Sequence, residues 1–362
     1  MYQKTLTFLF INLFLHIELF GQNAADIYKA SSNFISTLSE EQKKQTIYEF
    51  NDSFRLKWTN LPVGLVPRPG IQYGSLSDTS RLALHRVFTS ILSSQGYLKL
   101  NSIMALDDIL NTLYQIGYER GNLSQDVLKM SQDLKWSHEN YYLAIFGLPD
   151  HVKPWAIKFG GHHMALSATM KGNDISISPY FSGTDPSEVK SDKYAGLRVL
   201  SKEEDYGFML LHMLSTSQKA KVILSKETPR DIITSPNGPQ RIDQYYGLPG
   251  SMMTVSQKQM MELLINEYIH NFEHPIAHQF NSKIMKTGLN KVYFAWIGSQ
   301  ENNKPHYYIL HGPDFIIEYD NVGFQNDGNH IHCILRQTGN EFGEDLLKQH
   351  YNHMPHQTIP NN

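Results

Sequence analysis

The sequence predicts an α+β fold of two pseudo-repeats, each with helices first and an antiparallel β-meander afterwards. Stretches with helical apolar spacing and stretches with strand-like alternation occupy separate parts of the chain. Motifs of the first half also recur in the second half. Helices segregated from antiparallel strands are typical of the α+β class. We expect the pseudo-repeats to span about residues 26–186 and 196–350 and to join into one compact unit. Their two meanders can pair into one sheet or form stacked sheets.

The first 21 residues are predicted to be a secretory signal peptide. Lys4 supplies a positive charge, residues 6–20 are mostly apolar, and Gly21-Gln22 follows as a cleavage point. The apolar run is too short and too poorly flanked for a membrane span; the alternative is a buried first helix. We therefore expect residues 22–362 to form a single α+β domain that is secreted or periplasmic and not membrane-embedded.

Composition excludes some classes of partner. The net charge is −3 without a basic patch, so nucleic acid is not expected as a partner. The single cysteine, Cys333, excludes an intramolecular disulfide. On a strand, Cys333 faces away from its neighbour His332, so we interpret it as a small buried apolar residue rather than a metal ligand.

The apolar spacing places the expected helices ahead of the strands in each half. Helices are predicted over residues 26–50, 77–92, 97–114, 125–134, 201–214, 217–225, 254–271 and 275–287. Strands are predicted over residues 141–146, 155–159, 163–170, 175–180, 292–297, 306–311, 315–319 and 330–335. Polar turns at 171–174, 312–314 and 321–328 separate strands of the meanders.

Weak self-similarity relates the two halves. Residues 38–43 resemble 214–219, and residues 73–77 resemble 249–254, with the same offset in both cases. Residues 141–147 resemble 292–298 at a shorter offset, and the polar stretch 117–137 is a candidate for the insertion that explains the difference. Chance resemblance is the alternative.

The densest chemistry lies in the segment Asn329-His330-Ile331-His332. A His-x-His step on a strand puts both imidazoles on one face, which provides half of a metal site. Glu318 and Asp320 share a face for the same reason. A hairpin through Gly312-Pro313 is expected to bring His306 opposite residue 319 or 320, and the next strand to place His330 and His332 across from Asp320 and Glu318.

A second histidine pair, His162-His163, is predicted to complete the site. Adjacent strand residues face opposite ways, so only one of the two points into a given pocket unless Gly160-Gly161 forms a bulge that brings both nearer. The alternative is one core and one surface histidine.

These residues predict a divalent transition metal site, for zinc, copper or iron, held by His330, His332, His306 and His163 or His162. Glu318 or Asp320 would be a ligand or a general base. We expect a metal-dependent enzyme, with a hydrolase favoured over an oxidoreductase. The alternatives are a non-catalytic protein that binds a metal ion or a small polar molecule, and a metal-free polar network. The His-Glu-x-x-His, P-loop and Gly-x-Ser-x-Gly motifs do not occur.

The chain resembles the family catalogued as domain of unknown function 3500, whose members are mostly exported bacterial proteins. The resemblance is carried by residues 95–108, 159–166, 196–205, 294–298, 306–308, 317–321 and 329–332. It supports the identity of the key residues and implies no reaction, because the family assigns none. In the family, an acidic residue usually stands at the position of Gly160, so an activity that needs that residue is in question here.

Overall fold

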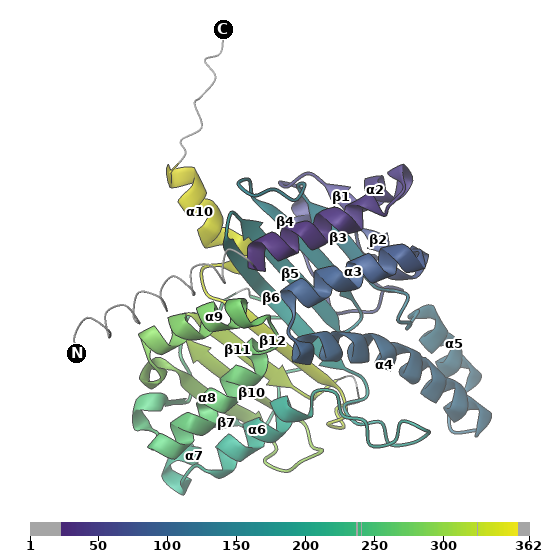
Figure 1. Cartoon of the computed structure of the whole chain (residues 1–362). Coiled ribbons are helices and arrows are strands. Elements are labelled where there is room, and N and C mark those ends of the chain that lie inside the picture. The colour runs from purple at the N-terminus through teal and green to yellow at the C-terminus, as the bar shows by residue number, and fades with distance from the viewer. Residues whose placement is uncertain (1–22, 237, 240, 324, 354–362) are drawn as a thin grey trace, which may run out of the picture.

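The computed structural model describes residues 23–236, 238–239, 241–323 and 325–353. The signal peptide predicted over residues 1–21 lies outside this part of the chain. Within the described residues, helices and strands form the mixed α/β architecture expected of the α+β class, built on one twelve-stranded sheet (Figure 1). No helix among these residues is both long enough and apolar enough to span a lipid bilayer.

The sheet contains two antiparallel meanders that meet at its centre. The strand order is β1-β3-β4-β5-β6-β12-β11-β10-β9-β7, with β2 on β3 and β8 on β9. The first-half strands are β1 (Ile47–Tyr48), β2 (Ile71–Gln72), β3 (Tyr142–Phe146), β4 (Trp155–Gly161), β5 (Met164–Lys171) and β6 (Asp174–Thr184). The second-half strands are β7 (Ile223–Ser225), β8 (Leu248–Pro249), β9 (Tyr293–Gly298), β10 (His306–Gly312), β11 (Phe315–Asp320) and β12 (Ile331–Gln337).

The two meanders form one continuous sheet rather than stacked sheets. β6 and β12 pair in antiparallel fashion, with Tyr180 opposite Leu335 and Gly183 opposite His332. The short outer strands β1 and β7 run parallel to β3 and β9, which makes the sheet mixed.

Most of the described helices begin at serine or threonine caps, whereas those over residues 201–212 and 274–287 begin after Leu200 and Glu273. Apart from a helix over residues 23–36, the helices are α2 (Glu40–Thr46), α3 (Asp78–Ile91), α4 (Ser94–Glu119), α5 (Gln125–Asp133), α6 (Ser201–His212), α7 (Thr216–Val222), α8 (Val255–Ile269), α9 (His274–Thr287) and α10 (Glu344–His353). Ser77 caps α3 and Thr254 caps α8, since each side chain accepts a backbone N–H of the first turn.

Two predicted helices are wrong at their C-terminal ends. Residues 47–48 of the helix predicted over 26–50 form β1, and residues 223–225 of the helix predicted over 217–225 form β7. The preceding helices α2 and α7 each end before an isoleucine, at Ile47 and Ile223, which continues as extended chain against the neighbouring strand. Pairing at the sheet edge therefore overrides helical spacing here.

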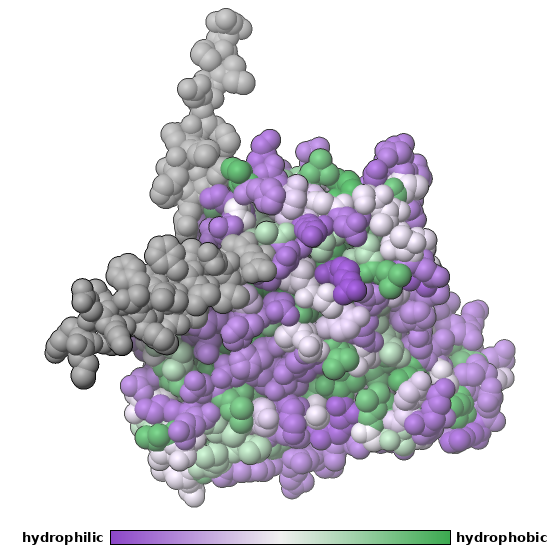
Figure 2. All heavy atoms as spheres, viewed as in Figure 1, coloured by the Kyte–Doolittle hydropathy of each residue, from purple (hydrophilic) through white to green (hydrophobic). Residues whose placement is uncertain are grey.

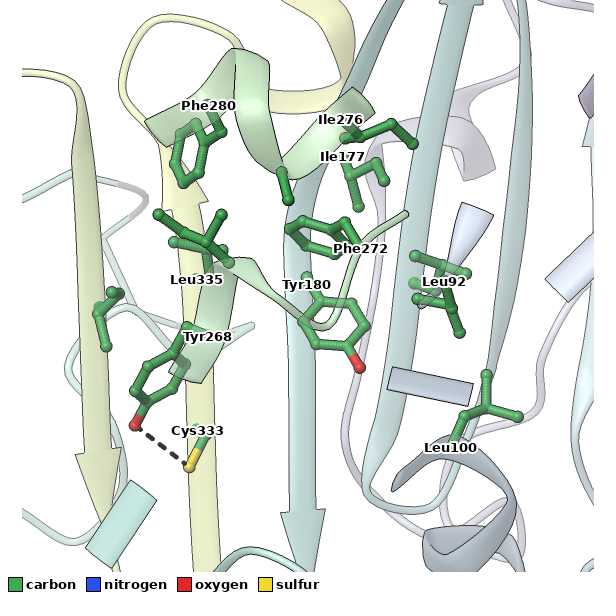
Figure 3. Packing of buried hydrophobic residues seen from close by; sticks show 14 of the residues in the cluster. Leu92, Leu100, Ile177, Tyr180, Tyr268, Phe272, Ile276, Phe280, Cys333 and Leu335 are labelled. Atoms are coloured by element: carbon green, nitrogen blue, oxygen red, sulfur yellow. Dashed lines mark hydrogen bonds between the residues drawn. The ribbon is translucent and has the colours of Figure 1, made fainter. Parts of the chain in front are cut away.

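The helices cover one face of the sheet, and the main hydrophobic core lies between the two layers (Figure 1). Tyr268, Phe272 and Ile276 of α8, α9 and their connection pack against Tyr180 of β6 and Leu335 of β12 (Figure 3). Cys333 is buried and free, as expected, and its Sγ lies 3.7 Å from the Tyr268 hydroxyl (Figure 3). The outer surface of the helical layer is mainly hydrophilic with scattered apolar residues (Figure 2).

The opposite face of the sheet is covered by loops instead of helices. Trp58 packs against a small cluster of Phe181, Ile334 and Ile232, and Ile242 packs against a second cluster on the same face. The segments around residues 54–69 and 228–245 therefore provide the cover on this side, which we call the loop face.

A buried ion cluster ties the helices of the two halves together. Lys99 Nζ of α4 lies 2.7 Å from Glu203 Oε1 of α6 and 2.6 Å from Glu267 Oε1 of α8. Burial of Glu203 raises the pKa of that carboxyl, which the positive charge of Lys99 counteracts. The cluster is thus held together by one cation between two acids.

The Lys99→Met variant tests this cluster. Removing the cation leaves two acids buried without their partner, so we expect unfolding free energy to fall by about 3 kcal/mol in chemical denaturation. The matched control is Lys43→Met, which removes an exposed ion pair with Glu40 and should change stability by less than about 0.5 kcal/mol. Equal effects of the two substitutions would contradict the role given to Lys99.

Candidate metal centre

Three histidines converge with their Nε2 atoms on one point. His163 Nε2 lies 2.8 Å from His330 Nε2 and 3.4 Å from His332 Nε2, and the last two atoms are 3.1 Å apart. His163 and His330 are buried and His332 is half-buried. Imidazoles from the two halves of the chain therefore form one cluster, which we call the triad.

The backbone brings these rings together at the β6–β12 junction. His163 lies in the turn between β4 and β5, with a positive φ of 60°, and its carbonyl accepts the Gly183 N–H at 2.8 Å. A Cβ on Gly183 would lie only 3.1 Å from a His332 ring carbon and 3.2 Å from a His163 ring carbon. The absence of a side chain on Gly183 therefore lets the turn approach His332.

Carboxylates lie behind the rings on the side away from the convergence point. His332 Nδ1 lies 2.8 Å from Asp231 Oδ1, and His330 Nδ1 lies 3.4 Å from Asp185 Oδ2. A neutral imidazole that donates from Nδ1 carries its lone pair on Nε2. These acids therefore favour the state in which His330 and His332 direct lone pairs at each other across 3.1 Å. Two such lone pairs repel unless a proton or a metal ion lies between them.

The nitrogen spacing fits a metal ion. For metal–nitrogen bonds of about 2.0–2.1 Å, tetrahedral angles put nitrogens about 3.3 Å apart, and right angles about 2.9 Å apart. The three separations of 2.8, 3.1 and 3.4 Å cover this range. A second group, formed by Asp231, Asp320 and His332, also places ligand atoms within 4.8 Å of one another. That group lies on the Nδ1 side of His332. It would therefore use Nδ1 of this ring as a ligand, whereas the triad uses Nε2.

Burial controls the charge of the triad. It lowers the pKa of His163 and of His330 well below the usual value, and the neighbouring imidazoles lower both further. Burial also lowers the pKa of His332, but the hydrogen bond to Asp231 and the nearby acids outweigh this and give a net increase. At neutral pH the first two rings are therefore free bases, the form that binds metals.

The acids near the triad carry raised pKa values. Burial raises the pKa of Asp320 to about 7 and that of Asp185 to about 6, while neighbouring histidines partly oppose the change. Asp320 lies opposite His332 across the β11–β12 pair, with Oδ2 3.9 Å from His332 Nδ1. The predicted register, with His330 opposite Asp320, is wrong by two residues.

Glu318 lies on the loop face but not beside the triad. It pairs with Ile334 rather than with His332, the partner expected from the sequence. Its carboxylate accepts N–H groups of Ile233 at 2.6 Å and Thr234 at 3.0 Å, and the Tyr307 hydroxyl at 2.8 Å. Glu318 therefore fixes the loop that carries Asp231.

The predicted position of His306 is wrong by one residue of register. Tyr307, not His306, lies opposite Asp320, so His306 faces the helical layer. Its ring stacks between Trp296 and Tyr319, with centroid separations of 4.7 and 5.2 Å. Burial lowers the pKa of His306 to about 4. The structure thus separates His306 from the triad.

His162 contacts the triad without joining it. Its ring stacks on that of His163 with a centroid separation of 3.6 Å, and its Nδ1 lies 2.6 Å from Asp107 Oδ1 of α4. The Tyr141 hydroxyl lies 3.0 Å from Asp107 Oδ2 and 2.6 Å from the His162 carbonyl. This network orients the turn that holds His163.

A cavity of about 560 Å³ opens onto the triad. Its wall contains the three triad histidines and His162, the loop residues Thr228 to Asp231, residues 60–62, and Val322, Gly323 and Asn326. Asp107, Asp185 and Asp231 were not among the predicted site residues. They come from a helix and two loops, where neither alternation nor motif spacing marks them.

The fold and the triad define a mixed α/β protein with a histidine-rich centre at the junction of two meanders. The chain belongs to the family described as protein of unknown function (DUF3500), whose model matches residues 20–344. The family resemblance expected from the sequence is thereby confirmed. No curated protein and no solved structure matches the chain.

The lowered pKa of His306 predicts a contribution to acid unfolding. The folded pKa of about 4 lies below the usual 6.5, so the unfolded chain binds the proton more tightly. The neutral ring therefore stabilises the fold above pH 6.5, and this contribution falls by about 3 kcal/mol as the pH drops to 4. His306→Phe should show a correspondingly shallower loss of unfolding free energy between pH 6.5 and 4. Parallel pH profiles for variant and wild type would disprove this assignment.

Proposed function

We propose that the triad of His163, His330 and His332 binds a divalent transition metal and that the protein is a metal-dependent enzyme. The observation that carries the proposal is the approach of the Nε2 atoms to within 2.8–3.4 Å of one another. With Nδ1 held by Asp231, neutral His332 directs a lone pair into this space, where a metal ion can take the place of a proton on Nε2. Zinc, copper and iron all accept imidazole nitrogen, so the metal identity stays open.

Two features favour an enzyme over a carrier. Catalytic metal sites commonly have three protein ligands and one position for a substrate, whereas structural sites are closed by four ligands. The triad supplies three nitrogens and faces a cavity of about 560 Å³, large enough for a small polar molecule. A metal held there would act as a Lewis acid toward a polar group of that molecule. The alternative is a non-catalytic protein that binds a metal or a small polar ligand.

Hydrolysis remains ahead of oxidation in this proposal. The cavity wall offers a half-buried carboxylate, Asp231, beside the imidazoles. In this proposal Asp231, rather than Glu318, is the acid of the cavity wall, and it holds Nδ1 of His332. Glu318 already accepts four hydrogen bonds, three from Ile233 and Thr234 and one from Tyr307. Asp320 and Asp185 would position His332 and His330 from behind.

Two further proposals concern the chain as a whole. The pattern of residues 1–21 supports export to the periplasm or the exterior. An internal duplication is supported by the strand order, which runs outward from the β6–β12 pair in corresponding steps on both sides. It is also supported by matching capping boxes at Ser39 and Ser215.

Removing two triad imidazoles tests metal binding. Purified without an affinity tag, the protein should contain about one transition metal per chain by elemental analysis. The double variant His330→Ala, His332→Ala should lose this metal while its circular dichroism stays unchanged. His311→Ala, which removes a buried imidazole elsewhere, is the control and should keep the metal. Full metal content in the double variant, or none in wild type supplied with zinc, copper and iron, would refute the centre.

Asp231→Asn tests the acid behind His332. Loss of the charge that orients the ring should weaken metal affinity by about 10- to 100-fold in competition with a chelator. Asp243→Asn, an exposed acid on the same connection between β7 and β8, should leave affinity unchanged. A screen of hydrolase and oxidase substrates with both variants then separates an enzyme from a binding protein, because a binding protein turns over none of them.

A further inference from the structure

A second polar site lies on the loop face, in a cavity whose lining residues differ from those of the triad cavity. Lys158 of β4 and Ser167 of β5 are directly paired across the strands, and both line a small cavity beneath Trp58 and Thr59. The cavity has a volume of about 40 Å³, enough for a few waters or one small ion. Arg68 also lines this cavity.

The Ser167 hydroxyl is an unused donor in this cavity. Ser167 is 3% exposed, and its Oγ has no hydrogen-bond partner among the described residues. It lies where the pairing of β5 with β6 shifts register, between Leu166 and Ala168. Bulges of this kind are common beside functional sites because they redirect a side chain. A buried hydroxyl without a partner costs free energy unless a ligand satisfies it.

The cations at this site lack acidic partners. Lys158 Nζ donates to the Phe54 carbonyl at 2.9 Å, and an ammonium group has three donors. Arg68 donates to the backbone carbonyls of Thr59 at 3.2 Å and Gly161 at 3.1 Å, and also to those of Val66 and Leu61. Within the described ranges, neither Lys158 nor Arg68 forms an ion pair with a carboxylate, and no carboxylate contributes to the pKa shift of either group. Burial, followed by the positive charges of Arg55 and Arg68, lowers the pKa of Lys158 to about 7.

Space for a ligand exists next to these donors. Gly160, two residues from Lys158 on the same strand face, lines the cavity without a side chain. A Cβ at this position would lie 2.9 Å from the Met164 carbonyl oxygen. Glycine at this position therefore fits the close approach of β5 and leaves this part of the cavity wall without a side chain.

We propose that Lys158, Arg68 and Ser167 form a binding site for a small oxyanion. The ammonium and hydroxyl groups would donate hydrogen bonds to it, and Arg68 would add positive potential. A tetrahedral anion such as sulfate or phosphate and a planar carboxylate share this chemistry. The site is independent of the triad, because it uses other residues and needs no metal.

Calorimetric titration of the full chain with sulfate, in the presence of a metal chelator, tests the site. The titration is done at pH 6.5 against chloride buffer of equal ionic strength. We expect saturable binding by wild type, at least tenfold weaker binding by Lys158→Met, and several-fold weaker binding by Ser167→Ala. Lys153→Met, which removes an exposed lysine of the same half, should bind as wild type does. Phosphate and acetate titrations identify whether the site prefers a tetrahedral or a planar anion.

Stability provides a second measurement. In chloride buffer the melting temperature of Lys158→Met should be higher than that of wild type, because the substitution removes a cation that has no acidic partner. Sulfate should raise the melting temperature of wild type and close this gap. The variant His330→Ala, His332→Ala should bind sulfate as wild type does. Absence of saturable binding of all three anions, equal binding by Lys158→Met or Ser167→Ala, or loss of binding in the triad variant would overturn the proposal.

Discussion

The antiparallel pairing of β6 with β12 is the constraint on which the rest of the structure depends. It joins the two meanders into one sheet and places Gly183 opposite His332. The same glycine donates its N–H to His163 in the β4–β5 turn, so one backbone contact fixes histidines from both halves. Side chains on one side of this pair, such as Tyr180 and Leu335, lie in the main core. Their neighbours Phe181 and Ile334 lie on the loop face. The register therefore determines both the packing and the position of the triad.

Much of the fold could be predicted from local patterns. Alternation along the strands located both meanders, and apolar spacing located α3 and α8, which Ser77 and Thr254 cap. The edge strands β1 and β7 were missed because they are two or three residues long and are stabilised by pairing with distant strands. The register of the β10–β11 hairpin was predicted wrongly. A shift of one residue moves His306 from the loop face to the stack between Trp296 and Tyr319. Period-two alternation identifies a strand but does not fix its partner residue.

The candidate site was predictable only where strands supplied it. His330, His332 and Asp320 follow from alternation along the predicted strands, whereas His163, which was predicted on a strand, lies in the turn between β4 and β5. Asp231, Asp185 and Asp107 reach the histidines from loops and from α4, and sequence distance carries no information about such contacts. Glu318 shows the reverse case. The sequence suggests a catalytic role because this acid is close to histidines along the chain. In the structure, its hydrogen bonds from Ile233 and Thr234 fix the loop that carries Asp231.

Charge is segregated along the loop face in a way that links the two sites. The acids Asp185, Asp231 and Asp320 surround the triad, whereas Lys158 and Arg68 lie around the neighbouring cavity. Arg68 connects the two regions, because its guanidinium binds the carbonyl of Gly161, next to the turn that carries His163. The same group holds the carbonyl of Thr59, in the segment that separates the cavities. A cation held by carbonyls rather than by carboxylates keeps its field available to a ligand. The segment around Arg68 can therefore fix the turn beside the triad while it leaves positive potential on its other side.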